Sequence, residues 1–444
     1  MSKLEYVSYS EMKDLPLDQL VWACRVNALY MVAKAGRGHL GTSLSSMEAI
    51  LAARRQMGEN DVFIGSKAHD AVAQYAVLQA LGTLDMERTI HSFRSAGGLP
   101  GHPELGIPGI FANCGSLGQG ISKSVGFARS GKGVVYCLLG DGEMMEGQNW
   151  EAALFAKKKQ VENIIAIVDC NGLSQDAAAF LSIEDIFKMF RGAGWTTLIV
   201  KNGNSYQDVE QSLIWARKNT DKGPTAILLK TVKGYGISEF AGQYWSHFGP
   251  PEDYAGALLE MKSHLSPELK YTRGPEYVYS VPQPHQLYKA FGEAVREAME
   301  QDDKIVLLTA DTARDLFVYD LGKEFPGRVI DCGVAEQNMV SMASALALDG
   351  YKPIVATYAR FLGRAAEQVY NQITEGTQVV YVGSLAGPLS ENGPGISHQC
   401  LWDEDPISYL MPTVEPNNPF AVGVALQRAL GGGISSYIRL RQQI

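Results

Sequence analysis

The sequence has 444 residues, 46% of them hydrophobic and 20% charged, which is a globular composition and excludes intrinsically disordered and fibrous proteins. Its 39 basic and 48 acidic residues give a net charge of −9, so we expect no nucleic-acid partner, because no basic stripe is present to neutralise a phosphate backbone. No apolar run approaches the roughly 18 residues that span a bilayer, and no secretory segment opens the chain, so we expect a soluble protein without membrane contact. The six cysteines form no CxxC pair, which favours reduced thiols in the cytoplasm. The length predicts two or three domains.

The first predicted element is an amphipathic helix near the N-terminus. Apolar residues recur at helical spacing from Leu17 to Val32, and the run ends at the glycines of residues 36–39. Further along, three β-rich runs alternate with helical stretches and are typical of fully buried parallel strands. These runs are Val134–Leu139, Asn163–Asp169 and Thr225–Val232.

A proline-rich segment separates this alternation from a second one. Residues 266–286 contain four prolines and no apolar periodicity, and we interpret them as an interdomain linker. Four more strands are predicted beyond it, at Ile305–Asp311, Pro353–Tyr358, Gln378–Ser384 and Ser435–Arg441. The predicted fold is therefore α/β, with two tandem doubly wound, mostly parallel-sheet domains at residues 1–265 and 287–444.

Two polar turns follow neighbouring strands of the first domain. Gly140, Asp141 and Gly142 come directly after the first strand, and Asn171 and Leu173 follow the next one. Ligands of open α/β sheets bind at the carboxyl ends of the strands, and glycines there let the backbone approach a phosphate. A carboxylate, an amide oxygen and a main-chain carbonyl suit Mg²⁺ or Ca²⁺ bridging a diphosphate. Each turn alone is equally typical of an ordinary tight connection.

Together the two turns resemble the diphosphate-binding motif of thiamine diphosphate (ThDP) enzymes. The resemblance to the transketolase family then extends along the chain, through segments 36–46, 66–78, 99–104, 115–122, 138–153, 230–238 and 332–339. It implies the ThDP-binding fold, with a diphosphate-binding first domain and a pyrimidine-binding second domain. It also implies ThDP and Mg²⁺ (or Ca²⁺ or Mn²⁺) as cofactors, and a homodimer whose active sites lie at the interface between the chains.

The resemblance assigns roles to three residues of the second half. Glu336 matches the glutamate that hydrogen-bonds the cofactor's pyrimidine and promotes removal of the thiazolium C2 proton. Tyr358 and Phe361 match the aromatic pair that packs around the pyrimidine. Taken alone, the glutamate would be a solvated helix-start residue and the two aromatic residues would belong to the core at a strand end.

Five histidines match active-site histidines of the family. His69 and His247 would lie near the diphosphate or the transferred oxygen. His39 and His102 would contact donor hydroxyls or relay protons, which suits an imidazole near neutral pH. His398 would contact the donor or the aminopyrimidine side. A structural role is the alternative for each of them, and it is our interpretation of the remaining three histidines, His91, His264 and His285.

The diphosphate-binding half of the resemblance adds further cofactor positions. The implied residues are Gly118, Gly140, Asp141, Gly142, Glu143, Glu146 and Asn171, with Asp141, Asn171 and Leu173 as the metal ligands. Glu146 and Glu151 are also expected to make contacts across the dimer interface. The alternative for these two is an ordinary helix face.

Two features depart from the family pattern. A family subunit normally continues into a third α/β domain, which we expect to be dispensable for cofactor contacts or to be supplied by a separate protein. The sugar-phosphate end of the pocket also differs. Pro394 replaces an aspartate, Ala386 a phosphate-binding histidine and His285 an arginine, whereas Arg441 keeps a phosphate-binding position. Losing polar partners should change the preferred substrate.

The resemblance, with these departures, implies a transferase that moves a two-carbon ketol or acyl unit from a ketose or 2-oxo donor to an aldehyde or ketone acceptor, in a specialised pathway. Arg364 and Arg360 are candidates for binding an acidic substrate, or they are surface arginines. A ThDP-dependent 2-oxo acid decarboxylase or acyl transferase is the alternative within the same cofactor class. A non-catalytic subunit that needs a third-domain partner and a plain nucleotide-binding protein are the other hypotheses, although the chain lacks both GxGxxG and GxxxxGK[ST].

Overall fold

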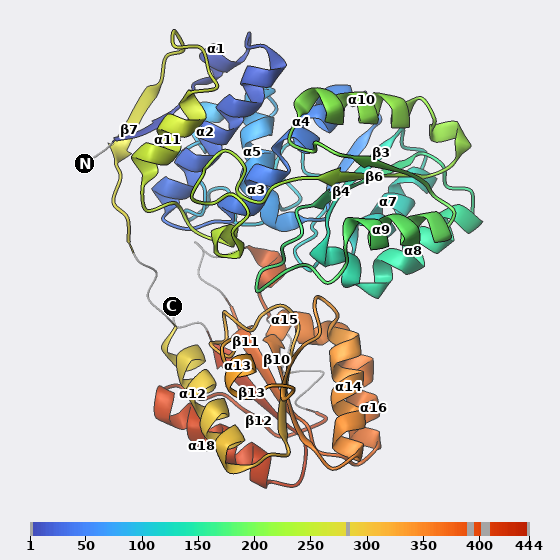
Figure 1. The fold of residues 1–444 in the computed structure, drawn as a ribbon, viewed down its shortest axis with the longest axis vertical. Helices are drawn as coiled ribbons and strands as arrows, with labels where there is room; N and C mark the ends of the chain where they lie inside the picture. The colour runs from blue at the N-terminus through green and yellow to red at the C-terminus, as the bar shows by residue number, and fades with distance from the viewer. Residues whose placement is uncertain (1–2, 281–284, 389–394, 401–408, 442–444) are drawn as a thin grey trace. The chain divides into compact units, whose positions relative to one another are not determined.

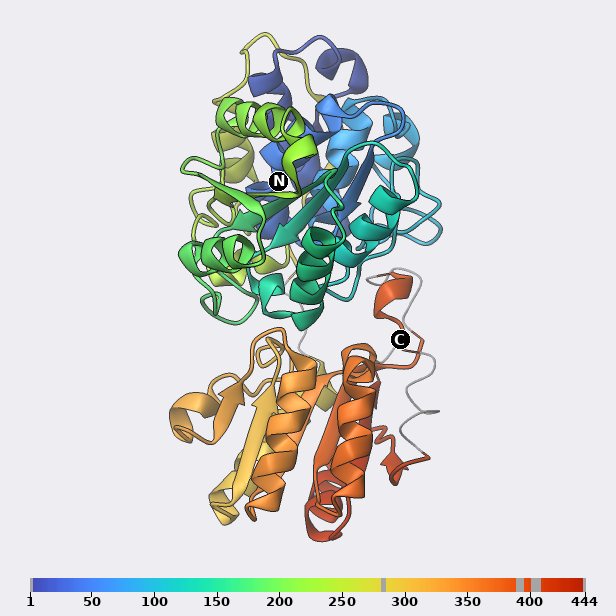
Figure 2. The same cartoon turned by 90° about the vertical axis from the view of Figure 1, so that its right-hand side faces the viewer.

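The computed structural model describes residues 3–280, 285–388, 395–400 and 409–441. Internal contacts divide the chain into two units, Met1–Ser280 with Glu391–Ser397 and Val281–Ser390 with His398–Ile444. Each unit is built on a parallel β-sheet with helices on both faces (Figures 1 and 2). The predicted doubly wound α/β architecture is therefore confirmed.

The first unit contains a five-stranded parallel sheet. Its strand order is β2 (Val62–Gly65), β3 (Val135–Gly140), β4 (Ile164–Cys170), β6 (Thr225–Lys230) and β5 (Thr196–Val200). Every residue of β3 and β4 is buried, because helices cover both faces of the sheet, and this explains why these strands are almost entirely apolar in sequence, with Asp169 of β4 as the one charged residue in them. We predicted β3, β4 and β6, whereas β2 and β5 were missed.

Two groups of helices cover this sheet. One face packs against α2 (Leu17–Ala35), α4 (Met47–Gln56), α5 (Ala71–Ala80), α10 (Tyr206–Arg217) and α11 (Tyr254–Lys262). The other packs against α7 (Gly120–Arg129), α8 (Gly147–Lys158) and α9 (Ile183–Gly192). The short helices α1 (Tyr9–Met12), α3 (Leu40–Ser45) and α6 (Met86–Thr89) complete the unit.

Helix α2 occupies the position predicted for the first helix and ends at Gly36, whose φ of 69° is left-handed. The prediction that this helix is amphipathic was wrong, because residues 20–33 are almost all buried. The helix contacts α5, α11 and the strand β1 (Lys3–Tyr6), so little of its surface remains for solvent. Both β1 and α1 precede it in the chain.

The segment predicted as a linker contains a strand. β7 (Thr272–Glu276) pairs in an antiparallel direction with β1, which lies at the other end of the unit's sequence. Gly274 lies so close to Tyr30 that a Cβ atom would come within 2.7 Å of that ring. Such long-range pairing leaves no local periodicity, so the proline and glycine content of the segment concealed the strand.

The second unit contains a six-stranded parallel sheet. Its order is β12 (Thr413–Val414), β13 (Ser436–Arg441), β11 (Val380–Ala386), β10 (Lys352–Tyr358), β8 (Ile305–Thr309) and β9 (Val329–Asp331). One face packs against α12 (Gln286–Gln301) and α18 (Pro419–Gly431), the other against α14 (Glu336–Leu348) and α16 (Ala366–Thr374) (Figure 1). The short helices are α13 (Leu321–Glu324) and α15 (Ala359–Leu362). We predicted all strands here except the very short β9 and β12.

Two further features of the described residues concern the helices and the cysteines. None of the helices within those residues combines the length and the hydropathy of a membrane-spanning segment. All six cysteines are buried and free.

Candidate functional site

Strands β3 and β4 end side by side in the first unit, and their turns are hydrogen-bonded to each other. The backbone N–H of Gly172 donates to Oδ2 of Asp141 (2.6 Å), and that of Gly142 donates to Oδ1 (2.8 Å). Oδ1 of Asn171 accepts from the backbone N–H of Leu173 at 3.0 Å. The structure thus brings the three predicted metal ligands together at the carboxyl edge of the sheet.

The charge at this edge favours a cation. Burial, together with the nearby Asp169 carboxylate, raises the pKa of Asp141 to about 7. A divalent cation would supply the opposite charge, and carboxylate, amide and carbonyl oxygens are the ligands that Mg²⁺ and Ca²⁺ prefer. The residues present therefore fit a hard divalent metal.

Glycines at this edge leave room for a ligand. A Cβ atom on Gly140 or Gly142 would meet only ordinary contacts, the nearest at 3.6 Å and 3.7 Å, so packing within the protein does not demand glycine there. Gly118 is different. Its φ is +83°, and a Cβ atom would lie 2.5 Å from Cβ of Glu146. The loop that contains Gly118 can approach Glu146 only because residue 118 has no side chain.

Glu143 ties three segments of this edge together. Its buried carboxylate accepts hydrogen bonds from the Ser66 hydroxyl, from Gly118 N (2.7 Å) and from Gly140 N (3.2 Å). The carboxylate therefore positions the loops that follow β2 and β3. A direct contact of Glu143 with the cofactor stays a prediction.

Two buried lysines next to these turns were missed in the sequence. Lys67 forms an ion pair with Asp169 and donates to the Thr42 carbonyl at 2.8 Å. Lys233 donates to the Ser174 carbonyl, in the turn after β4, at 2.7 Å. Both lysines lie inside segments quoted above for the family resemblance, so the signal was present although the residues were not singled out.

Four of the five predicted histidines form one cluster in the first unit. The His39 ring centroid lies 5.8 Å from that of His69 and 5.2 Å from those of His102 and His247, and the last pair, His69 and His247, is 5.4 Å apart. Burial, reinforced by Lys67 for His69 and by Lys233 for His247, holds the pKa of these two imidazoles well below the usual range. Both are therefore neutral near pH 7 and can donate or accept hydrogen bonds.

Arg94 is a buried cation beside this cluster that the sequence analysis did not identify. Its side chain is 8% exposed, and its Nε and Nη1 have no hydrogen-bond partner among the described residues. Its guanidinium lies 5.6 Å from the ring centroid of Phe248, which contacts the His39 ring at 4.9 Å. The backbone φ of Arg94 is +52°, a strained conformation for a residue with a long side chain.

Glu336 begins helix α14 in the second unit and is 3% exposed. Burial raises the pKa of its carboxyl to about 7. Oε2 has no hydrogen-bond partner among the described residues, and a cationic nitrogen, Nη1 of Arg364, lies 3.8 Å from it. A buried carboxylate oxygen in this state suits a ligand nitrogen that shares a proton with it, which is what the predicted pyrimidine contact requires.

Aromatic side chains gather at the end of β10. The rings of Tyr358 and Phe361 lie 5.0 Å apart, and the Phe361 ring lies 5.5 Å from that of the buried His398. The Tyr358 hydroxyl donates to Asp315, in the loop after β8. Their contact with a pyrimidine stays a prediction, and Pro394 lies outside the described residues.

The remaining candidates are two glutamates near the start of α8 and the three histidines interpreted as structural. Glu146 is buried and Glu151 is exposed on α8. The three histidines interpreted as structural all contact aromatic residues. His264 stacks on Trp22 (3.7 Å), His91 hydrogen-bonds Tyr30 (2.7 Å), and His285 stacks on Tyr288 (3.9 Å).

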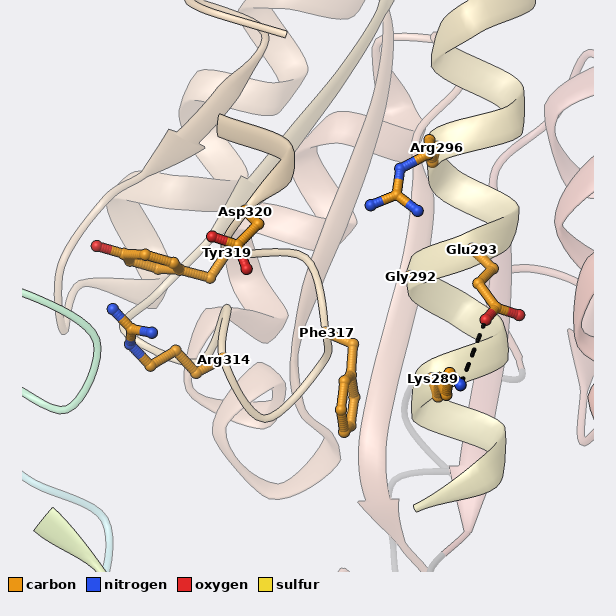
Figure 3. A pocket seen from close by; sticks show the side chains of 8 residues that line it. All are labelled: Lys289, Gly292, Glu293, Arg296, Arg314, Phe317, Tyr319 and Asp320. Atoms are coloured by element: carbon orange, nitrogen blue, oxygen red, sulfur yellow. Dashed lines mark ion pairs between the residues drawn. The ribbon is translucent and has the colours of Figure 1, made fainter. Parts of the chain in front are cut away.

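The second unit also contains a cavity of about 290 Å³. It is lined by residues of α12 and of the loop between β8 and α13, including Lys289, Arg296 and Arg314 (Figure 3). Lys289 pairs with Glu293 at 3.9 Å, and Arg296 pairs with Glu324 at 2.7 Å. None of the residues lining it is a predicted site residue.

Two family models match the chain. The thiamine diphosphate binding domain of transketolase matches residues 17–311, and the pyrimidine binding domain of transketolase matches residues 283–443. The chain belongs to the transketolase family. Its cofactor is therefore thiamine diphosphate, with which a divalent metal ion is standard in this family.

Known transketolases are similar in sequence to most of this chain. Mouse transketolase is 32% identical over 409 residues and human transketolase 32% over 410 residues, each match covering 83% of this chain and 65% of the relative. The chain thus spans about two thirds of the length of these relatives. Solved transketolases from Pichia stipitis and Leishmania mexicana share the fold, each with a TM-score of 0.53 at 22% identity over 96% of this chain and 77% of theirs.

Proposed function

We propose that this transketolase-family chain is a ThDP-dependent transferase. It moves a two-carbon ketol or acyl unit from a ketose or 2-oxo donor to an aldehyde or ketone acceptor. Bound ThDP supplies a carbanion-stabilising centre for making and breaking the carbon–carbon bond. One solved family structure, from P. stipitis, is described as a complex with sedoheptulose 7-phosphate, a ketose.

The observation that carries this proposal is the cluster of four histidines beside the Asp141–Asn171 edge. Chemistry on a hydroxylated donor requires protons to leave and return to oxygen atoms, and imidazole rings whose centroids lie near 5 Å from one another suit that task. His102 and His39 would hold or move protons at donor hydroxyls. Glu336 would hold the proton that it shares with the pyrimidine.

The direct test is NMR-detected hydrogen–deuterium exchange of the ThDP C2 proton on the purified protein with Mg²⁺. We expect fast exchange in the wild type and a collapse of the rate in Glu336→Gln. The matched control is Glu297→Gln on the exposed face of α12, which should exchange like the wild type. Exchange no faster than that of free ThDP would contradict the proposal.

A second candidate, decarboxylation of a 2-oxo acid, is favoured by Arg94. A buried arginine with two nitrogens that have no hydrogen-bond partner in the described part of the chain would gain most from an acidic group on the ligand. Release of CO₂ from 2-oxo acids, lost in Arg94→Gln, would support this reaction. Turnover of ketoses without any CO₂ release would favour ketol transfer instead.

We further propose a cytoplasmic homodimer in which each active site combines Asp141 of one protomer with Glu336 of the other. The family resemblance supports this arrangement, and the free cysteines fit a reducing compartment. A separate protein supplying a third domain is a further partner to be sought by copurification.

A further inference from the structure

A carboxylate bridges two arginines at the end of the second unit's sheet. Glu415, directly after β12, accepts from Nη1 of Arg439 at 2.6 Å and pairs with Nε of Arg441 at 2.9 Å. The Arg439 side chain is 3% exposed, whereas those of Glu415 and Arg441 are 32% and 50% exposed. The cluster therefore presents Glu415 and Arg441 to solvent on top of a buried arginine.

The cluster lies on the edge of the sheet that carries the other site residues. All strands of this sheet are parallel, and Arg441 is the last residue of β13, so it sits at the carboxyl edge, where ligands of such sheets bind. Gly387, after β11, packs against its guanidinium, because a Cβ atom there would lie 3.1 Å from Nε. Gly387 in turn exchanges backbone hydrogen bonds with Cys400, two residues after His398.

We infer that Glu415 is a specificity-determining residue that discriminates against a phosphorylated substrate at this edge. The inference rests on the proposed function, since it concerns the substrate of the same site. An exposed arginine at the carboxyl edge is well suited to hold a phosphate through charge-assisted hydrogen bonds. Here the Glu415 carboxylate already uses one of its donors and repels a dianion.

An uncharged polyol group meets no such repulsion. A substrate hydroxyl can donate to the Glu415 carboxylate and accept from Arg441, so the pair is complementary to hydroxyl-bearing groups. A dianionic phosphate would instead have to approach a carboxylate held in place by a buried arginine. Recognition of this kind works by placing a repulsive group against the wrong ligand.

The test compares phosphate affinities of holoenzyme saturated with ThDP and Mg²⁺. Inorganic phosphate is titrated by calorimetry, and kcat/KM is measured for a five-carbon ketose with and without a 5-phosphate. Glu415→Gln should bind phosphate about tenfold more tightly, and its preference should shift by a similar factor toward the phosphorylated ketose, which corresponds to about 1.4 kcal/mol. Glu415→Asp keeps the charge and should keep the wild-type discrimination.

Two controls test whether the increase in phosphate affinity arises from the Glu415–Arg439–Arg441 cluster. Glu324→Gln removes a carboxylate that pairs with Arg296 elsewhere in the same unit, and it should leave phosphate affinity unchanged. The double variant Glu415→Gln/Arg441→Gln should lose the gain seen with Glu415→Gln alone. Wild-type affinity for phosphate in Glu415→Gln, or a gain that survives in the double variant, overturns the inference. Calorimetry needs no turnover, so absent C2 exchange would count against the proposed function alone.

Discussion

At the scale of single residues, buried charged side chains lie at the carboxyl edge of the sheet in each unit. Asp169 is fully buried and accepts from Lys67, from the Thr231 hydroxyl and from Ser45 (2.6 Å). It also contacts the amide nitrogen of Asn171 at 3.4 Å, which leaves the amide oxygen for Leu173 and a cation. The ion pair thus links the core of the first unit to the predicted metal ligands.

Removing one member of the Lys67–Asp169 pair should be much worse than removing both. Lys67→Met leaves a buried carboxylate without its cation and should lower the free energy of unfolding by about 3–5 kcal/mol. The double variant Lys67→Met/Asp169→Asn should recover most of that loss. Chemical denaturation measures both. The control, Lys323→Met, breaks an exposed pair with Asp320 and should cost less than about 1 kcal/mol. If the single and double variants lose the same free energy of unfolding, the unpaired Asp169 carboxylate is not the cause of the loss.

Glu336 should make the stability of the apoprotein depend on pH. Its folded-state pKa of about 7 lies above the ordinary value of 4.5, so the folded state holds the proton more tightly. Stability should therefore fall as pH rises from 4.5 to 7, and the whole penalty should be present above pH 7. Glu336→Gln removes the penalty.

We accordingly expect Glu336→Gln to raise the Tm of the apoprotein by several degrees at pH 8 and by little at pH 5, measured by thermal unfolding. Glu297→Gln, on the exposed face of α12, serves as the control and should show no such pH-dependent difference. A Tm increase of equal size at both pH values would argue against a raised pKa at Glu336.

At the scale of elements, the first site is made of short connections at strand ends. The loop before α7 and the turns after β3 and β4 are held by side chains that accept backbone N–H groups, those of Glu143 and Asp141, and Glu143 also accepts from the Ser66 hydroxyl after β2. Because the strands are buried and regular, small shifts in these turns would displace the predicted ligands. Backbone geometry in the turns is therefore expected to be sensitive to substitution.

Gly118→Ala tests that sensitivity. The added methyl group meets Glu146 at 2.5 Å in a left-handed conformation, so the loop must shift. We expect ThDP and Mg²⁺ to bind at least about tenfold more weakly, a change of about 1.4 kcal/mol that calorimetry can measure. Gly126→Ala is the matched control, because Gly126 lies within α7 with open space around it. That control should be neutral or slightly stabilising, and equal effects of both substitutions would contradict the prediction.

At the scale of the whole molecule, the chain contains two complete parallel-sheet units, each with its own cores. One unit presents Asp141 and the histidine cluster, and the other presents Glu336 and the aromatic residues after β10. The cofactor's two ends therefore have their predicted partners on different units. In the homodimer proposed above, those partners would come from different chains.

Mixing two inactive variants tests this arrangement. Asp141→Asn and Glu336→Gln should each be inactive, whereas unfolding and refolding them together should restore about a quarter of the wild-type activity, since half of the dimers are mixed and one of their two sites is intact. Each variant refolded alone is the control. No recovery, with mixed dimers detected by mass spectrometry, would mean that each site is formed within one chain.

Much of the architecture followed from local patterns. β3, β4, β6, β8, β10, β11 and β13 were predicted, because most strands buried on both faces are near-continuous apolar runs. β2, β9 and β12 were missed because such short strands carry little of that signal, β5 because most of its residues are only half-buried, and β7 because its partner lies at the opposite end of the unit. The surroundings of α2 also depend on distant segments, so its burial was not predictable from its own periodicity.

The sequence by itself determined the family, the doubly wound fold and the residue types at the strand ends, because these depend on motifs and on patterns within short windows. Only the tertiary structure decided which side chains share a neighbourhood. It joined Lys67 to Asp169, placed Arg94 beside Phe248 and set Glu415 between two arginines. Burial, ion pairing and the raised pKa of Glu336 arise from contacts between segments far apart in the chain, and no local pattern encodes them.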